Sequence, residues 1–513
     1  MDVSILFRFA ASVLAVLFVH SLAAAGPRVL IRTVAEGGET WRYTTDKPND
    51  RWTEPGFEDG RWARGKAGFG VTDSVTPRST IGTPWSTSDI WLRKSIDVPA
   101  PLEFTRAGLT VRHDEDVAVY VNGALVFSAS GYNTAWTAYD VTGELKAALR
   151  PGRNVVAVHV TQTSGGQYID VGLVLDPEKK LAVPVRPMSP AALQKLRDAR
   201  WPAEKAWKWY AKVGPICGCN YVPRTAVNTT EMWQKETFDP NTIGEELAWA
   251  KRHGLNSVRV FVQYIVYEAD PDGLTRRMDR FLAIAARGGI SVMFVLFDDC
   301  FKPEPKLGGQ PEPVPGVHNS QWTSSPGNRR KAPEHRPRLE KYVRHVVGRF
   351  ARDGRVLVWD LYNEPKRQSR PLVEAAFAWA RAAKPSQPLT TCWQASDLCD
   401  VVSFHDYGKP DPGQLARRTA ERPAICTECI ARGRGSTFQA VLPAFAAEGI
   451  GWYMWGLVKG RIQTYYPWGS PKGAAEPERW HHDLLKPDGS PHRPEEIELI
   501  RRFPGQWRPR RGS

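Results

Sequence analysis

From residue 211 onward, short apolar runs alternate with segments of helical periodicity, and this alternation limits the possible folds more than any other feature. Eight apolar runs can be counted, at 213–219, 257–262, 290–297, 356–361, 389–393, 401–404, 424–427 and 451–455. Helices are expected between most of them, at 242–253, 274–287, 338–352, 372–383, 414–421 and 437–448. Near-continuous apolar strands such as SVMFVLF are typical of a parallel sheet covered on both faces. Eight β/α units in roughly 250 residues predict an α/β fold of the (β/α)8 TIM-barrel type.

The main alternative for this half is a doubly wound open sheet, which would give the same alternation. Such a sheet is expected to carry a glycine-rich loop after its first strand, and the segment CGCNYVP lacks the G-x-G-x-x-G pattern. The segment 302–337 after the third run is rich in Pro and Gly and too long for an ordinary connection. In a barrel, a loop at this place is expected to cover the face that carries the site.

The first half of the chain has a different pattern. Residues 28–176 hold short alternating runs separated by turn signals, among them Asn122-Gly123 between VYV and LVF, which is a strong hairpin signal. Few helical periods occur here. The pattern predicts a β-sandwich of the jelly-roll type that precedes the barrel.

The expected domain organisation follows from these two halves. Residues 1–25 contain an apolar stretch that ends in Ala23-Ala24-Ala25, which is typical of a cleaved signal peptide and predicts a secreted or periplasmic protein. No long apolar run follows it, so a polytopic membrane protein is excluded and the mature protein is expected to have no membrane contact. We predict the jelly roll over 26–176, a linker and connecting helix over 177–209, and the barrel with a C-terminal extension over 210–513, as the domain that would carry any active site.

Carboxylates follow two of the apolar runs. Asp360-Leu361-Tyr362-Asn363-Glu364-Pro365 comes at the end of the fourth run, and Thr427-Glu428-Cys429 ends the seventh. Because the C-terminal ends of barrel strands form one rim, Glu364 and Glu428 are expected to meet there. Two carboxylates that flank a bound sugar are what glycoside hydrolysis requires. The alternative is that Asn-Glu-Pro is only an exposed turn.

The barrel half resembles clan A glycoside hydrolases, and within them the family 5 cellulases and mannanases. The resemblance lies in VLVWDLYNEP, SFHDY, ICTE and GWYMWG and spans about residues 211–490. It implies that Glu364 is the acid/base, that Glu428 is the nucleophile and that Asn363 hydrogen-bonds the sugar.

Further positions match this family one by one. The resemblance implies that Arg259 in SVRVF steadies the nucleophile and that Tyr407 in FHDY hydrogen-bonds it, with His405 beside them. It implies that Trp455 stacks on a sugar, and Trp393 is a second candidate for that role. The alternative for each is a structural role, since such residues are more often part of a core.

One position departs from the family pattern. Many members carry a His after the third strand, where this chain has Asp298-Asp299. We expect these acids to hydrogen-bond sugar hydroxyl groups or to bind a cation.

The first half resembles the galactose-binding-like jelly roll of glycosidases, including the sugar-binding domain of glycoside hydrolase family 2. The resemblance lies in the W-x4-F-x-D-x2-W-x2-G-x3-F-G pattern of residues 52–70 and in IWLRKSIDV, VYVNG, PGRNVVAVHV and IDVGLVL. Such a domain either binds sugar or braces the barrel, and its tryptophans fit both roles.

The expected activity is that of a retaining glycosidase acting on β-linked poly- or oligosaccharides of the glucan, mannan or xylan class. We expect a monomer that needs no cofactor and no metal ion. A non-catalytic carbohydrate-binding protein on a decayed barrel is the alternative, and the intact Glu364 and Glu428 argue against it. A nucleic-acid binder is suggested only by the net charge of +14. That surplus lies in residues 181–513, where basic residues are interleaved with acidic ones rather than gathered into a binding motif.

The chain has seven cysteines, all in the second half. Cys217-x-Cys219 and Cys426-x-x-Cys429 lie in apolar runs, so we interpret them as buried thiols rather than zinc ligands, because no second matching pair occurs. A local disulfide, with Cys392–Cys399 as one pairing, is compatible with an oxidising compartment.

Overall fold

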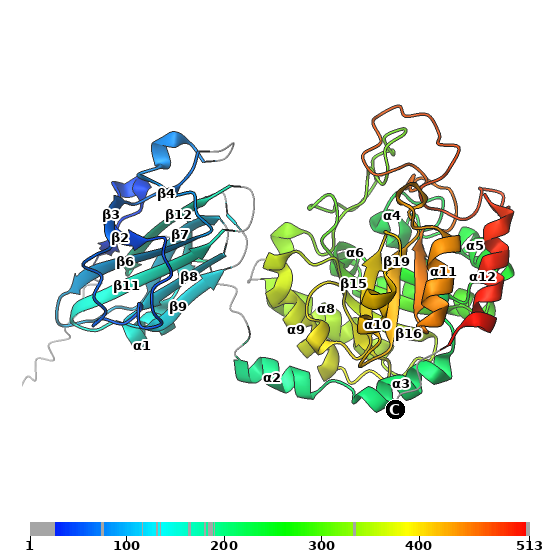
Figure 1. Ribbon diagram of the computed structural model, residues 1–513, viewed down its shortest axis with the longest axis horizontal. Coiled ribbons are helices and arrows are strands. Elements are labelled where there is room, and N and C mark those ends of the chain that lie inside the picture. Colours follow the sequence, from blue (N-terminus) through cyan, green and yellow to red (C-terminus); the bar gives the residue numbers. More distant parts are fainter. Residues whose placement is uncertain are drawn as a thin grey trace, which may run out of the picture. The chain divides into compact units, whose positions relative to one another are not determined.

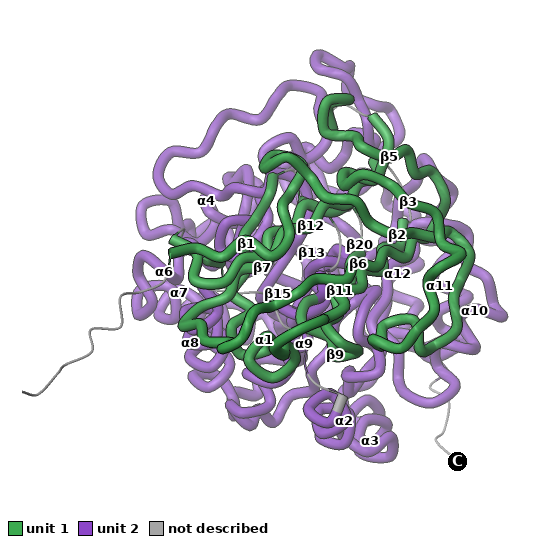
Figure 2. Tube along the Cα trace, turned by 90° about the vertical axis from the view of Figure 1, so that its left-hand side faces the viewer, with its two compact units in different colours: residues 1–127, 132–182 green, residues 128–131, 183–513 purple. Residues whose placement is uncertain are grey.

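The computed structural model describes residues 26–72, 76–114, 116–129, 132–133, 135–162, 166–178, 181–182, 188, 190–331 and 335–508. The chain divides into two compact units, one of residues 1–127 and 132–182 and the other of residues 128–131 and 183–513 (Figure 2). The expected signal peptide, 1–25, lies outside the described residues. Among the helices that are described, none is both long and apolar enough to span a membrane.

The first unit is a β-sandwich, as the sequence predicts. One sheet has the order β10-β7-β12-β4-β5, with β1 paired to β12, and the other has the order β3-β2-β6-β11-β8-β9. Their bounds are β1 Arg28–Ile31, β2 Thr40–Thr44, β3 Ala63–Lys66, β4 Phe69–Gly70, β5 Thr83–Pro84, β6 Asp89–Val98, β7 Ala107–Asp114, β8 Asp116–Val121, β9 Ala124–Ala129, β10 Thr137–Asp140, β11 Gly152–Thr161 and β12 Tyr168–Leu175, with the helix α1 Thr142–Ala148.

The jelly-roll tryptophan pattern serves packing within this unit. Arg93 is buried and donates to Asp59 Oδ2 at 2.9 Å, while its guanidinium lies 5.1 Å from the ring centroid of Phe57. Trp52 packs edge-on against Tyr120 at 5.6 Å between ring centroids. These pattern residues therefore join the loop around 52–59 to the central strands β6 and β8.

The second unit contains the predicted eight-stranded parallel barrel, which is nearly closed. Its strand order is β17-β16-β15-β14-β13-β20-β19-β18. The bounds are β13 Cys217–Asn220, β14 Ser257–Phe261, β15 Ser291–Asp298, β16 Val356–Asn363, β17 Leu389–Thr390, β18 Val402–Asp406, β19 Ala424–Cys429 and β20 Gly451–Trp455. All eight predicted runs thus become strands, and the ladder is open only between the short β17 and β18.

Helices surround these strands (Figure 1). Those that alternate with the strands are α5 Pro240–Arg252, α7 Pro271–Arg287, α8 Arg336–Arg349, α9 Arg370–Ala382, α10 Pro412–Arg418, α11 Phe438–Ala447 and α12 Pro494–Gln506. The short α4 Thr229–Trp233 and α6 Tyr264–Ala269 precede α5 and α7. Between β17 and β18 the described chain holds only the 3-10 turn Ser396–Leu398 instead of a helix. The sequence predicted six of these helices and missed α12, which follows the long loop after β20.

Helix starts follow from local chemistry. Asp239 accepts hydrogen bonds from the backbone amides of Asn241 and Thr242, and Pro240 occupies the first turn of α5. Asp270 caps α7 in the same way, again with a following proline. A capping carboxylate satisfies amide donors that the first turn leaves free, and proline has no amide to lose there.

The segment predicted as linker and connecting helix holds two helices of the second unit, α2 Pro190–Asp198 and α3 Ala203–Val213. Arg197 pairs with Asp397 at 2.8 Å, and the amide of Trp201 donates to Asp400 Oδ1 at 2.8 Å. Tyr210 on α3 is fully buried and donates through its hydroxyl to the carbonyl oxygen of Gly449 at 2.9 Å. From at least Pro190 onward, the chain is therefore part of the barrel unit.

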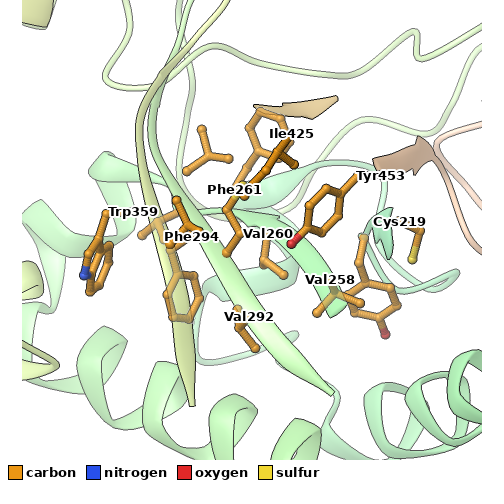
Figure 3. Packing of buried hydrophobic residues seen from close by; sticks show 14 of the residues in the cluster. Cys219, Val258, Val260, Phe261, Val292, Phe294, Trp359, Ile425 and Tyr453 are labelled. Atoms are coloured by element: carbon orange, nitrogen blue, oxygen red, sulfur yellow. The ribbon is translucent and has the colours of Figure 1, made fainter. Parts of the chain in front are cut away.

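Apolar side chains of the strands form a buried core in the barrel unit (Figure 3). Val258, Val260, Phe294 and Trp359 are fully buried in it, on the side of their strands opposite to inward-pointing residues such as Arg259 and Asp360. Gly218 is required on β13, because a Cβ atom at that position would come within 2.4 Å of the ring of Tyr453. This packed core supports the rim at the C-terminal ends of the strands.

Candidate active site

Two glutamates meet at the C-terminal rim of the barrel. Glu364 directly follows β16, and Glu428 lies near the end of β19. One carboxylate oxygen of Glu364 and one of Glu428 lie within 4.8 Å of each other. Glu364 has a backbone φ of +42°, a left-handed conformation that is uncommon for a residue with a side chain and is concentrated at functional sites.

Strand register places the other rim residues. Asn220 on β13 is level with Arg259 on β14, and His405 on β18 is level with Glu428 on β19. The ladder is irregular between Phe404 and His405, and bulges of this kind redirect side chains at barrel rims. The strand ends thus bring together residues that are far apart in the sequence.

Arg259 is a fully buried cation that connects these residues. Its Nη1 donates to Oε1 of Glu428 at 2.8 Å and to Oδ1 of Asn220 at 2.8 Å. Its Nη2 donates to Oδ1 of Asn363 at 2.7 Å and to Oδ2 of Asp360 at 2.7 Å. A planar guanidinium with five donors fits several acceptors at fixed angles, so Arg259 fixes the position of Glu428.

Glu428 is a buried carboxylate with hydrogen-bond donors to both of its oxygens. Burial raises its pKa, and Arg259 and a hydrogen bond from Tyr407 oppose that shift. The Tyr407 hydroxyl donates to Oε2 of Glu428 at 2.7 Å. Because both oxygens of Glu428 accept hydrogen bonds and one partner is a cation, its charge is compensated in place.

Glu364 has a different environment. Burial raises its pKa, and the opposing hydrogen bond comes from a neutral thiol, since Sγ of Cys300 donates to its Oε2 at 3.2 Å. Its Oε1 lies 2.7 Å from Nδ1 of His405. Burial lowers the pKa of His405 to about 4, so the imidazole is neutral near pH 7. Among the described residues no lysine or arginine contacts Glu364, and Arg259 opposes the rise of its pKa only from a distance.

A cavity of about 180 Å³ opens beside the two carboxylates. Its lining combines polar groups of the rim with large aromatic rings: Cys300, Phe301, His318, Asn319, Trp322, Asn363, Glu364, Tyr407, Glu428, Trp455, Trp468 and His482. Trp455 and Trp322 meet edge to face with ring centroids 5.6 Å apart. Rings and a few polar groups around a small cavity are the usual composition of a small-molecule site.

The structure places the predicted site residues in three groups, of which the third, Asp298, Asp299 and Trp393, lies outside the cavity lining. Glu364, Glu428, Asn363, Tyr407 and Trp455 line the cavity. Arg259 and His405 do not line it, but each contacts a carboxylate that does.

The two aspartates predicted to bind sugar or a cation lie outside the cavity lining. Asp298 is buried and accepts from Nε1 of Trp322 at 2.7 Å and from Nδ2 of Asn363 at 2.9 Å. Asp299 faces Lys331, the hydroxyl of Tyr362 and the hydroxyl of Ser369. Protein donors therefore occupy both carboxylates, and Asp298 orients two residues that do line the cavity.

Trp393 also lies outside this cavity. Its side chain is 62% exposed, its φ is +62°, and its ring lies edge-on to His405 with centroids 5.9 Å apart. It contributes to a second, more open depression that includes Arg417, Arg418 and Phe404. Trp393 is thus at the edge of the carboxylate site, on the side of His405.

Several cavity residues were not predicted. Cys300 comes directly after Asp298-Asp299 at the end of the third strand, so its position in the sequence could have indicated a place at the rim. His318, Asn319 and Trp322 come from the long insert that was expected to cover the site, and Trp468 and His482 come from the loop after β20. Loop residues carry no strand register, so sequence periodicity cannot assign them to a site.

One group of side chains at the rim could in principle hold a metal ion. The described residues offer one set of possible metal ligands, Glu364, His405 and Glu428, which is the carboxylate site itself. Arg259 and Tyr407 already bond both oxygens of Glu428, and a guanidinium at that distance opposes a second cation.

All seven cysteines are free thiols, so the Cys392–Cys399 disulfide considered from the sequence is wrong. Cys392 Sγ instead accepts a hydrogen bond from the amide of Glu364 at 3.0 Å.

Comparison with known proteins finds similar structures but no similar sequences. No protein-family model matches the chain. No curated protein matches it in sequence. Among solved structures, GH5_18 from Streptomyces cattleya in complex with GlcNAc is 13% identical with a TM-score of 0.40, covering 58% of this chain and 82% of its own. An exo-beta-1,4-mannosidase from an Opitutaceae bacterium is 17% identical with a TM-score of 0.42, covering 57% of this chain and 60% of its own.

A beta-glucuronidase from Bacteroides uniformis is matched over both units. It is 12% identical with a TM-score of 0.35, and the match covers 94% of this chain and 70% of that protein. These similar structures are glycoside hydrolases of families 5 and 2. The two family 5 matches extend over little more than half of this chain, whereas the match to the beta-glucuronidase extends over most of it.

Proposed function

We propose that this protein is a glycoside hydrolase that cleaves β-linked carbohydrates with retention of configuration at the anomeric carbon. The observation that carries the proposal is the pair Glu364 and Glu428, whose nearest ligand oxygens lie within 4.8 Å of each other. Retaining enzymes place their two carboxyl groups about 5–5.5 Å apart, whereas inverting enzymes need about 6.5–9.5 Å to admit a water molecule. The short separation supports direct attack by a carboxylate.

In the first step, an oxygen of Glu428 forms a bond to the anomeric carbon while the bond from that carbon to the leaving oxygen breaks. Glu364 transfers its proton to the leaving oxygen, which departs as an alcohol. The assignment of roles rests on the environments, because Arg259 and Tyr407 compensate the charge of Glu428 and the contacts of Glu364 include no cation. A fixed cation and a fixed phenol also hold the attacking oxygen in place.

In the second step, Glu364 is a carboxylate and removes a proton from water. The water oxygen attacks the anomeric carbon, and the ester bond to Glu428 breaks, which regenerates both groups. Asn363 is held by Arg259 and Asp298, so its amide is fixed beside the same reaction centre. Two inversions give net retention.

Replacement of each glutamate by glutamine tests the assignment. E428Q should lower kcat/KM by at least about 10⁴-fold with every leaving group, because the attacking oxygen is lost. E364Q should lower it strongly for alkyl and aryl leaving groups that need a proton but much less for 2,4-dinitrophenyl glycosides. E421Q, at an exposed glutamate that pairs with Arg200, is the matched control.

Three results would overturn the proposal. Product analysis by proton NMR, taken before mutarotation, should show the β-anomer first, and the α-anomer would exclude retention. Unchanged hydrolysis by E364Q and E428Q would exclude this site, and a complete lack of hydrolysis by the wild-type protein over β-linked polysaccharides and aryl glycosides would favour a non-catalytic carbohydrate-binding protein.

The proposal extends to substrate class and location. We place glucans, mannans and xylans first, because aromatic rings beside the carboxylates suit the flat faces of β-linked sugars. We also propose export on the basis of residues 1–25. N-terminal sequencing of the protein recovered from the periplasm or medium should begin at Gly26, and recovery of the full-length chain from the cytoplasm alone would contradict export.

A further inference from the structure

Two long loops join at the far wall of the cavity. One follows β15 and includes residues 316–322, and the other follows β20 and includes residues 456–493. The amide of Asn319 donates to the carbonyl oxygen of Ile462 at 2.9 Å, and the amide of Gly316 donates to Oε1 of Gln463 at 3.0 Å. A third bond runs from the amide of Gly473 to the carbonyl oxygen of Pro315 at 2.8 Å. The wall is thus made by contacts between the two loops.

Each loop contributes a histidine to this wall, and a backbone carbonyl fixes each tautomer. Nδ1 of His318 lies 2.7 Å from the carbonyl oxygen of Tyr466, and Nδ1 of His482 lies 2.5 Å from that of Ile430. A carbonyl oxygen can only accept, so both Nδ1 atoms carry hydrogen. In a neutral imidazole the other nitrogen is then an acceptor. Both Nε2 atoms are therefore hydrogen-bond acceptors.

The two imidazoles remain neutral in the working range of most enzymes. Burial lowers the pKa of His318 to about 4. Burial also lowers the pKa of His482 well below its ordinary value, and the nearby His318 and His481 add to the shift. The ring centroids of His318 and His482 are 5.4 Å apart, so protonation of one opposes protonation of the other.

Two acceptors of this wall are buried without a hydrogen-bond partner among the described residues. Within the described chain, neither Nε2 of His482 nor Oδ1 of Asn319 accepts a hydrogen bond, although both residues are 1% exposed. Buried polar atoms are nearly always paired, so such groups beside a cavity indicate a ligand that supplies donors. The described residues that line the cavity include no lysine and no arginine.

We propose that His318, Asn319 and His482 form a subsite that binds one neutral sugar ring by accepting hydrogen bonds from its hydroxyl groups and that rejects a uronic acid at the same position. This inference rests on the proposed glycoside hydrolase function and names the sugar class of that site. A hydroxyl group can donate to an imidazole nitrogen or an amide oxygen. A carboxylate at the same place can only accept, and it would meet acceptors in a lining whose described residues include no cation in direct reach.

The subsite lies on the side of the nucleophile. The ring of His482 is 5.5 Å from that of Tyr407, whose hydroxyl donates to Glu428. Trp468 completes this side, with its ring 4.9 Å from Tyr407. The cavity of about 180 Å³ is smaller than the roughly 300–1,000 Å³ of pockets that bind drug-sized molecules, so it suits a single ring.

Binding of simple glycosides to the full-length protein tests the subsite. The probes are the methyl β-D-glycosides of glucose, mannose, galactose, xylose and N-acetylglucosamine, together with methyl β-D-glucuronide, titrated by tryptophan fluorescence at pH 7. We expect at least one neutral glycoside to bind, and the glucuronide to bind at least about 100-fold more weakly than the best of them.

Variants connect this selectivity to the named residues. H482F should weaken the best neutral glycoside about fivefold to tenfold, because the acceptor is lost, whereas H482Q keeps an acceptor oxygen and should recover part of the affinity. H318F should act in the same direction as H482F. H253F is the matched control, since His253 is buried, contacts the carbonyl oxygen of Gly489 and lies outside the cavity.

Three results would overturn the subsite. They are glucuronide binding as tight as that of the best neutral glycoside, unchanged affinity in folded H482F and H318F, and binding of none of the six probes. Hydrolysis and its loss in E428Q are measured separately. A protein that hydrolyses glycosides through Glu428 but prefers uronides would therefore retain the proposed function and contradict the subsite.

Discussion

Sγ of Cys300 lies 3.2 Å from Oε2 of Glu364 and donates a hydrogen bond to it. Burial raises the pKa of this thiol well above its ordinary value, so the thiol keeps its proton and acts as a donor. A donor to a carboxylate stabilises the ionised form, so Cys300 opposes the effect of burial on the pKa of Glu364. Cys300 is therefore a positioning residue for the proposed acid/base.

Removal of this donor should move the alkaline limb of the pH profile. In C300V, which keeps a similar volume without a donor, the pKa of Glu364 should rise, and kcat/KM should remain high to a higher pH than in the wild type. C300S keeps a donor and should behave like the wild type. The measurement is the pH dependence of kcat/KM with a 4-nitrophenyl glycoside, whose alkaline limb reports the essential acid.

The matched control is C217V, because Cys217 is buried at the start of β13 and does not contact a carboxylate of the site in the described structure. An alkaline limb that stays in place in a folded and active C300V variant would contradict the role of Cys300.

Tyr407 should contribute through its single hydrogen bond to Glu428. Y407F removes a donor to a charged group, which is worth about 1.5–3 kcal/mol and predicts a loss of roughly tenfold to 100-fold in kcat/KM. Y453F is the control, since the hydroxyl of Tyr453 is buried and bonds Ser257 at 2.7 Å instead of a rim residue. Equal losses in both variants would indicate a general effect on the barrel instead of an effect on the nucleophile.

Asp483 should make the stability of the barrel depend on pH. Burial raises its pKa to about 7, against an ordinary value of 3.8, so the folded state favours the protonated form. The stability that protonated Asp483 contributes to the folded state is fully present below pH 3.8, its ordinary pKa. It is lost as the pH rises from there through about 7.

D483N removes this titration and should therefore gain stability over the wild type as the pH rises from 4 to 7. The expected difference is several degrees in the melting temperature between pH 5 and pH 8, followed by circular dichroism. T464V, which removes the hydroxyl donor of Asp483, is the companion variant and should lower the melting temperature at pH 8, because the buried carboxylate loses a hydrogen bond that stabilises its ionised form. A constant difference between D483N and the wild type across this range would exclude Asp483 as the titrating group.

Trp393 should matter for long substrates and not for short ones. Its exposed ring lies outside the cavity but next to His405, so it can stack on a sugar beyond the reaction centre. W393A should raise KM for an oligosaccharide about twofold to tenfold and leave KM for an aryl glycoside unchanged. Y132A, at an aromatic residue of the first unit that is 63% exposed, is the control. Equal effects on both substrates would place Trp393 outside substrate binding.

The sequence predicted the barrel and much of the rim because both depend on strand periodicity. Once eight strands are assigned, Arg259, Glu364 and Glu428 fall at their C-terminal ends, and a parallel barrel brings these ends together. The side chains of Asp298 and Asp299 could not be predicted in the same way. Their direction depends on the donors of Trp322 and Ser369, which are brought close only by folding.

The far wall of the cavity was beyond prediction for a similar reason. His318 and His482 are separated by more than 160 positions in the sequence, and each lies in a loop without regular hydrogen bonding. Their positions follow from contacts between the loops, such as that of His318 Nδ1 with Tyr466, which no local pattern encodes.

The hydrogen bonds between the two loops have a consequence for the cost of binding. Asn319, Gly316 and Gly473 each tie one loop to the other through backbone groups, so the wall is complete before a sugar arrives. A ligand that must order loops loses affinity to their conformational entropy, whereas a preorganised wall avoids that loss. In this protein the entropy of fixing both loops is lost once, when the chain folds, rather than each time a ligand binds.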